Sequence, residues 1–208
     1  MKQYLFFALN LLLALEGTSQ AKGDYMWQIG QNSHPQENPY ALSMVLDFNV
    51  LGINLDTFYR GMKMGYFNAS ISDVDGKLLV YSNGCQIKNG DHSNIPETMS
   101  LSPGETDFEW CLSNPSSGYP KFEGGLFISF FSDSIILLLH QRDYVLSNPT
   151  RIITDSLFYS SVQRDGDQYV LHEKTVPIVG DNLTDGNVEA VKASKPGAWW
   201  VIQGEKNS

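Results

Sequence analysis

The sequence predicts an all-β protein, and three observations predict this class. Pairs of β-prone runs joined by short polar turns recur along the chain. No long window places apolar residues at the spacing of a helical face. The last three turns follow one another roughly 30 residues apart, a spacing typical of repeat architectures. Together these features indicate a sandwich, a barrel or a propeller.

The start of the chain has the order of a secretory signal peptide. A single early positive charge, Lys2, precedes an apolar run that only Asn10 interrupts. Small residues follow, and Ser19 and Ala21 fit the small-x-small rule for cleavage after Ala21. An uncleaved anchor is the alternative, but the apolar run is shorter than the roughly 20 residues that a membrane span needs. We therefore expect residues 1–21 to be removed on export.

The mature chain, residues 22–208, is long enough for one domain with a hydrophobic core. Residues 126–139 come closest to a membrane segment, but Ser129 and Asp133 interrupt their apolar character, so we expect no membrane span in the mature chain. The net charge of -9 argues against nucleic acid and against anionic membrane surfaces as partners. We expect a secreted or cell-surface protein.

Four pairs of runs predict β-hairpins. The turn of the first pair is Asp73-Val74-Asp75-Gly76, where glycine can take the positive φ that a short hairpin turn requires. Polar turns join the other three pairs as well. The paired runs are residues 66–72 with 77–82, 125–131 with 135–140, 157–163 with 168–172, and 188–193 with 198–203.

Two adjacent tryptophans, Trp199 and Trp200, lie in the last of these runs. Neighbouring residues of a strand point to opposite faces of the sheet. We expect one indole to enter the core, because a tryptophan buries a large apolar area. For the other indole, packing against a neighbouring sheet is favoured over stacking on a sugar.

The two cysteines, Cys85 and Cys111, lie in a long irregular stretch, residues 83–122, that is rich in polar residues and proline. An exported chain enters an oxidising space, where an even number of cysteines indicates a disulfide. Such a bridge would stabilise this stretch by about 3 kcal/mol in the chain-entropy model. Two separate buried thiols are the alternative, and we favour the disulfide.

One ordered set of segments carries a family resemblance. The longest is residues 69–87, ASISDVDGKLLVYSNGCQI, and the others are residues 27–30, 46–49, 110–111, 118–120, 124–126, 157–160, 173–174 and 199–202. The set resembles the N-terminal β-propeller region of secreted bacterial proteins that end in a type IX secretion sorting domain. It covers most of the mature chain.

This resemblance implies a fold and a cellular location, but no single ligand. The fold would be a partial β-propeller of about two to three blades, a fragment of a larger ring that is incomplete at the C-terminus. The protein would be displayed on the cell surface or secreted. The sorting domain and the later blades of the family are absent from this sequence, and a partial ring would leave two sheet edges open.

The acidic and histidine residues give no recognisable metal motif. Asp73 and Asp75 begin like a calcium loop, but Lys77 and Gly84 occupy later positions where the EF-hand pattern needs ligands. The four histidines are never paired at metal-binding spacing, so we assign them no ligand role. They are His34, His92, His140 and His172.

Three alternating acidic residues, Glu105, Asp107 and Glu109, would share one face of an extended segment and could bind a cation. A solvated acidic loop is the interpretation that we favour. The chain also lacks the G-x-S-x-G elbow of serine hydrolases, a P-loop and a dinucleotide-binding glycine pattern. We therefore predict no catalytic, cofactor-binding or metal-binding residues.

Three functional hypotheses follow. The first is an exported, non-enzymatic surface or secreted β-propeller that binds or adheres to a protein or glycan ligand. The second is the N-terminal part of an exported hydrolase whose active residues lie in missing blades. The third is a structural spacer.

Overall fold

The computed structural model describes residues 24–30, 43–50, 52–58, 61–113, 118–147 and 150–206. The predicted signal peptide, residues 1–21, and His34 lie outside these ranges. Strands make up 54% of the described residues, and they form several antiparallel sheets, none of which closes on itself in the described part. The all-β class is therefore confirmed.

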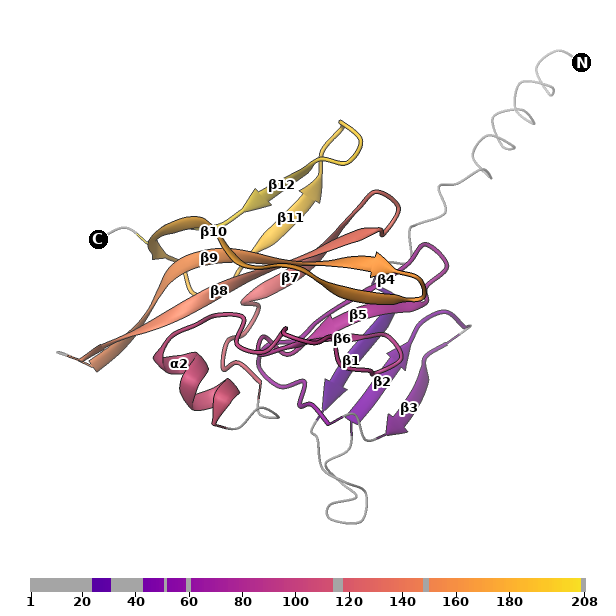
Figure 1. Cartoon of the computed structure of the whole chain (residues 1–208), viewed down its shortest axis with the longest axis horizontal. Helices are drawn as coiled ribbons and strands as arrows, with labels where there is room; N and C mark the ends of the chain where they lie inside the picture. The colour runs from indigo at the N-terminus through magenta and orange to yellow at the C-terminus, as the bar shows by residue number, and fades with distance from the viewer. Residues whose placement is uncertain are drawn as a thin grey trace, which may run out of the picture.

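The N-terminal half holds two three-stranded sheets, each of which pairs strands that are consecutive in the chain (Figure 1). The strands of the first sheet are β1 (Met26–Gly30), β2 (Ser43–Asp47) and β3 (Asn54–Phe58). The strands of the second sheet are β4 (Ala69–Ser72), β5 (Leu78–Ser82) and β6 (Ile87–Asn89). The predicted hairpin around Asp75-Gly76 is the β4–β5 pair.

The C-terminal half holds a four-stranded sheet and a separate hairpin. The four-stranded sheet consists of β7 (Gly125–Phe130), β8 (Ile135–Ser147), β9 (Thr150–Asp165) and β10 (Gln168–Leu183), and the hairpin consists of β11 (Glu189–Lys192) and β12 (Trp199–Ile202). The other three predicted hairpins are confirmed by these pairings. Strands β8 to β10 extend well beyond the predicted runs.

Successive sheets contact one another through their first strands. Strand β1 contacts β4, β4 contacts β7, and β7 contacts β11. The Ser70 hydroxyl of β4 donates a hydrogen bond to the Met26 carbonyl of β1, 2.8 Å away. Between the last two sheets, the Trp199 indole N–H donates to the Ser129 carbonyl of β7 at 3.2 Å.

The largest core cluster lies between the β4–β6 sheet, the following connection and the four-stranded sheet. Apolar side chains from all three contribute to it, including Phe67, Leu79, Ile87, Leu138 and Val162. A second cluster joins β7, β8 and β9 to the C-terminal hairpin, and the Trp199 ring packs against it.

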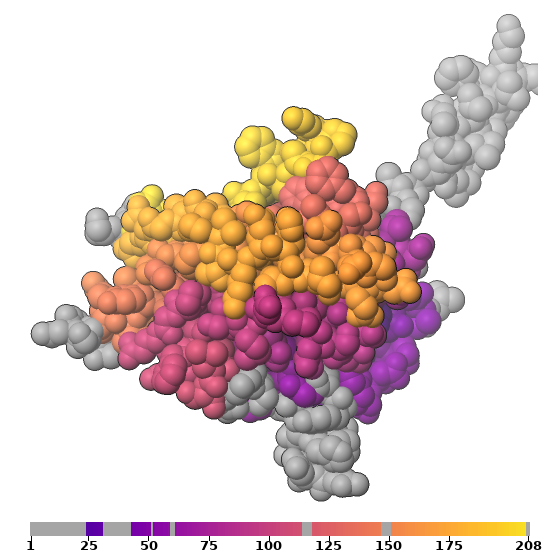
Figure 2. Space-filling model, viewed as in Figure 1, coloured from indigo at the N-terminus to yellow at the C-terminus, as the bar shows by residue number. Residues whose placement is uncertain are grey.

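The indole of Trp200 lies on the opposite face of β12 from that of Trp199. Trp199 is partly buried against the second cluster, as expected for one of the two rings. Trp200 is 69% exposed, so the expectation that the other ring packs against a neighbouring sheet is wrong. In the space-filling view the β11–β12 hairpin, in yellow, projects from the rest of the molecule (Figure 2).

The long connection after β5 is partly helical. It contains a short helix, α2 (Glu105–Asp107), which continues into a π-helical turn, η1 (Phe108–Leu112). Cys85 and Cys111 lie at disulfide distance, with their Cα atoms 5.2 Å apart. The connection is therefore held to the end of β5 at its helical segment.

The prediction of a solvated acidic loop is right for the exposure of two of its three acidic residues and wrong for the third and for the conformation. Glu105, Asp107 and Glu109 lie in α2 and η1, and only Glu105 and Glu109 are exposed. Asp107 is buried, and the Ser100 hydroxyl donates a hydrogen bond to its carboxylate. Burial raises the pKa of Asp107 above its usual range. Packing against the core, rather than local charge, sets the conformation of this segment.

Candidate functional site

Four hairpin turns gather at one end of the molecule (Figure 1). They join β4 to β5, β7 to β8, β9 to β10, and β11 to β12, and we call this region the turn end. Direct bonds hold two of the turns together. The Arg164 backbone N–H donates to the Ser134 carbonyl at 2.9 Å, and the Tyr169 hydroxyl donates to the Asp133 carbonyl at 2.7 Å. Turns placed on a rigid sheet scaffold are common positions for binding residues.

Three of these turns enclose a groove of about 510 Å³, which we call the turn groove. Its volume lies within the range of small-molecule sites. Its walls come from the β4–β5, β7–β8 and β11–β12 hairpins. The lining residues are residues 71–74, 129–133, 192–193 and 195–199.

Phe131 presents its ring at the turn groove from a constrained backbone. Phe131, Ser132 and Asp133 have φ values of 51°, 52° and 62°, so three successive non-glycine residues are left-handed. Each such residue costs roughly 1–2 kcal/mol relative to a right-handed conformation. The Phe131 ring is nevertheless 73% exposed and gains little from burial. A strained turn that displays an apolar ring to solvent is typical of a functional site.

The turn groove also contains polar groups without partners in the described part of the chain. Ser72 is 3% exposed, and its hydroxyl oxygen is buried with no hydrogen-bond partner there. Lys192 and Lys195 are exposed, and neither forms an ion pair with any described carboxylate. The Lys192 ammonium instead lies 5.4 Å from the centre of the Trp199 ring. The two lysines can still donate hydrogen bonds to a ligand, whereas the Ser72 hydroxyl is covered in this conformation.

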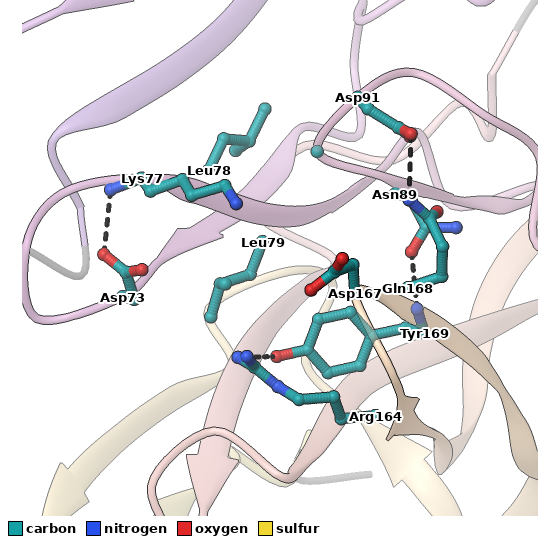
Figure 3. Close-up of a pocket in the computed structure, with 11 residues that line it drawn as sticks. Asp73, Lys77, Leu78, Leu79, Asn89, Asp91, Arg164, Asp167, Gln168 and Tyr169 are labelled. Atoms are coloured by element: carbon teal, nitrogen blue, oxygen red, sulfur yellow. Dashed lines mark hydrogen bonds between the residues drawn. The ribbon is translucent and has the colours of Figure 1, made fainter.

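A second pocket at the turn end, of about 310 Å³, lies between the β4–β5 turn, the loop after β6 and the β9–β10 hairpin (Figure 3). Most of its polar groups already bond one another. Gln168 donates to Asp91 at 2.9 Å, and the Asn89 side chain accepts the Tyr169 backbone N–H at 2.8 Å. The Arg164 guanidinium donates to the Tyr169 hydroxyl at 2.9 Å. This pocket is therefore better explained as a hydrogen-bonded contact between sheets than as a ligand site.

The Asp73 carboxylate, which begins the rejected calcium motif, shapes the β4–β5 turn. It accepts the backbone N–H groups of Asp75 and Lys77, both at 2.9 Å. Gly76 has a φ of 88°, and a Cβ atom there would lie 1.8 Å from the Asn49 side chain. The turn chemistry predicted for this sequence is thus confirmed, with Asn49 as a further reason for glycine.

His140 is fully buried between two serines. Its Nδ1 lies 2.9 Å from Ser102 Oγ, and its Nε2 lies 3.0 Å from Ser160 Oγ. Ser102 donates its own hydrogen to the Gln141 carbonyl, so it accepts from Nδ1–H, while Ser160 accepts from the Thr175 N–H and donates to Nε2. Desolvation lowers the pKa of His140 to about 3.

The Ser102–His140–Ser160 group resembles a nucleophile beside a base only in composition. All three residues are 0% exposed, so no substrate reaches them in this conformation. The neutral imidazole is satisfied as one donor and one acceptor. Of the other histidines described, His92 lies beside the Tyr81 hydroxyl at 3.0 Å and His172 is exposed. The group stabilises the sheet and the connection packed on it.

A buried lysine forms the other interior polar centre. The Lys121 ammonium contacts the carboxylate of Asp143, the Thr154 hydroxyl at 2.8 Å and the Asp185 carboxylate at 2.6 Å. Sequence reasoning missed this centre, because its members are far apart in the chain and share no motif. It also missed Phe131, although two aromatic residues directly before a polar turn are a signal that could have found it.

Among the described residues, no three histidine, cysteine or acidic side chains are grouped so as to hold a metal ion. The described part of the chain also has no helix long and apolar enough to cross a membrane. The disulfide-distance cysteine pair is compatible with an extracellular location. The chain matches no family model, no curated protein and no solved structure.

Proposed function

We propose that this chain is an exported, non-enzymatic binding module of a β-propeller kind, and that it binds a glycan in the turn groove. The observation that carries the proposal is Phe131, an exposed ring held by three successive left-handed residues at the mouth of the groove. Strain of this kind persists where the surrounding structure imposes it, and it gathers at ligand-binding sites.

The sheet arrangement supports the propeller part of the proposal. In a propeller the first strand of each blade lies near the axis, beside the first strands of neighbouring blades. The contacts of β1 with β4, β4 with β7, and β7 with β11 follow this order. The four-stranded meander β7 to β10 has the strand number and order of one blade.

The chemistry of the groove favours a glycan over a protein partner. A sugar ring offers C–H groups that pack on an aromatic face and hydroxyls that need several hydrogen-bond partners. Phe131 offers the face, while Lys192 and Lys195 offer exposed donors that form no ion pair with a described carboxylate. The groove is concave and of small-molecule size, whereas a stable protein interface buries about 800 Å² on each partner.

A glycan array probed with the full chain tests the proposal. We expect binding to a restricted set of glycans and a loss of at least about tenfold in affinity for Phe131→Ala, which corresponds to about 1.4 kcal/mol. Phe122→Ala is the matched control, because Phe122 is also a strongly exposed phenylalanine, at 70%, and lies outside the groove.

Three outcomes would contradict the proposal. The first is binding only to a protein array. The second is equal loss of glycan binding in Phe131→Ala and Phe122→Ala. The third is turnover of a hydrolase substrate by the purified chain, without binding of any unreacted glycan.

A further inference from the structure

Lys121 and Asp143 form a closely contacting pair in a dry part of the molecule. Their side chains are 1% and 7% exposed, and the Lys121 ammonium donates directly to the Asp143 carboxylate. The Thr154 hydroxyl bridges the two side chains, because it accepts a hydrogen bond from Lys121 at 2.8 Å and donates one to Asp143 at 3.2 Å. The pairing of β8 with β9 is irregular between Arg142 and Asp143, and such bulges re-aim side chains.

A second carboxylate reaches the same ammonium from the solvent side. Asp185 Oδ1 lies 2.6 Å from Lys121 Nζ, although the Asp185 side chain is 79% exposed. The buried Gln141 side chain holds the Asp185 loop in place. It donates to the Thr184 carbonyl at 3.0 Å and accepts the Gly186 N–H at 2.9 Å. Asp185 is thus positioned between the buried amine and water, where a carboxylate can carry protons.

The surroundings leave space for the lysine stem and bury both members of the pair. A Cβ atom at Gly124 would lie 2.6 Å from Lys121 Cδ, so glycine there makes room for the stem. The Asp143 backbone N–H donates to the buried Tyr119 hydroxyl at 2.8 Å. Desolvation is the main cause that raises the pKa of Asp143, which favours its neutral acid form.

We propose that Lys121 Nζ and Asp143 Cγ condense into an intramolecular amide, with Asp185 as the proton carrier. Nothing in the proposed glycan site depends on this bond. The contact, the burial and the second carboxylate together supply what amide formation needs: a nitrogen nucleophile held against the carboxyl group that it attacks, and a general acid–base at the nitrogen.

The step balances without an added reagent. A proton first moves from the ammonium to the Asp143 carboxylate, which gives a neutral amine and a neutral acid. The amine lone pair then attacks Cγ, Asp185 removes a proton from the nitrogen, and that proton leaves with the departing hydroxyl as water. The products are one amide and one water molecule. One positive and one negative charge disappear together, so the net charge is unchanged.

The bond would give the long connection a second covalent tie. Cys85, at its start, and Cys111, in its helical segment, already lie at disulfide distance. Lys121 stands at its end, directly before β7, and an amide to Asp143 would fix that end to β8. Both ties would resist unfolding of a segment that has few regular backbone hydrogen bonds of its own.

Mass spectrometry of the full chain, purified after export and reduced, tests the proposal. We expect an intact mass lower by one water molecule than the processed sequence requires. We also expect no tryptic cleavage after Lys121, and fragment ions that join the Lys121 peptide to the Asp143 peptide. An unmodified mass would overturn the proposal and leave a buried ion pair. Loss of water without a joined peptide, as from a succinimide, would overturn it equally.

Two variants separate the roles. Asp185→Asn keeps the buried pair and is at an exposed position, so it should fold, and the joined peptide should form at least tenfold more slowly. Asp155→Asn is the control, since Asp155 pairs with Arg142 at 2.6 Å and contacts no lysine within ion-pair distance in the described residues. If Asp185→Asn formed the joined peptide at the wild-type rate, the role of Asp185 would be wrong. If Asp185→Asn failed to fold, the wild-type mass would still decide whether the amide forms.

Discussion

The interior polar centres and the turn end use similar residues in opposite ways. In the interior, Lys121 and His140 are buried, and each polar atom of their side chains has partners. At the turn end, Lys195 has no described ion-pair partner and Phe131 exposes its ring. A lysine therefore stabilises the fold in one region and remains exposed to solvent in the other.

This difference between the two regions indicates which residues can be assigned a function rather than a role in stability. A buried polar group is costly unless it is satisfied, so a satisfied one is explained by the fold itself. An exposed ring on a strained turn has no such explanation. Substitutions in the two regions should consequently separate stability from binding.

The largest expected effect is on the lysine of the interior. Lys121→Met should lower the free energy of unfolding by about 3–5 kcal/mol, because it leaves the Asp143 carboxyl buried without the Lys121 nitrogen, to which it is either ion-paired or, if the proposed amide forms, covalently joined. Lys195→Met, at the turn end, should change it by no more than about 0.5 kcal/mol. Urea denaturation measures both. Equal effects of the two substitutions would remove the distinction between the regions.

The next effect concerns the cysteine pair. Replacing Cys85 and Cys111 together by serine should lower the free energy of unfolding by about 3 kcal/mol, through the greater entropy of the unfolded chain. The same loss should appear when the wild-type protein is unfolded with a reducing agent present. Identical denaturation curves with and without the reductant would show that no disulfide forms.

A pH dependence should distinguish the buried histidine from an exposed one. The folded-state pKa of His140 is about 3, below the value of about 6.5 for an unfolded chain, so the unfolded state binds the extra proton between these values. Stability is thus fully present above about pH 6.5 and falls by about 1.4 kcal/mol for each pH unit below it.

Denaturation midpoints between pH 7 and pH 5 measure this dependence. His140→Gln should flatten the slope, although it lowers the stability at pH 7. His172→Gln, at an exposed position, should keep the wild-type slope. If the slope persisted in His140→Gln, protonation of His140 would not be its cause.

The smallest expected effect on stability is at the turn that presents Phe131. Ser132→Gly should raise the free energy of unfolding by up to about 1 kcal/mol, because glycine tolerates the positive φ at that position. Ser134→Gly is the control, since Ser134 lies in the same turn without a positive φ, and it should be slightly destabilising. A loss of stability in Ser132→Gly would show that the left-handed turn carries no strain.

The parts of the fold that local chemistry decides could be predicted from the sequence. Alternating β-prone runs and polar turns identified four strand pairs, because strand period and turn residues are local properties. The same signals missed the pairings of β1 with β2, β2 with β3, β5 with β6, and β8 with β9. The positions of Cys85 and Cys111, at disulfide distance, agree with the pairing expected of an exported chain.

The parts that long-range packing decides could not be predicted. Strand β10 runs through Pro177 and several register irregularities, which a sequence pattern would exclude from a strand. Residues 105–112 form helical turns because they pack on the core, although their acidic pattern indicates a loop. Likewise, nothing local brings Lys121 to Asp143 or the β11–β12 turn to Phe131.

Hydrogen–deuterium exchange with a glycan that the array identifies tests the central claim most directly. We expect the ligand to slow exchange in the three turns of the turn groove, residues 71–77, 129–134 and 192–199, and to leave the interior strands around Lys121 and His140 unchanged. Protection confined to the β1–β3 sheet or to the surface around Phe122, with none at the three turns, would contradict the claim.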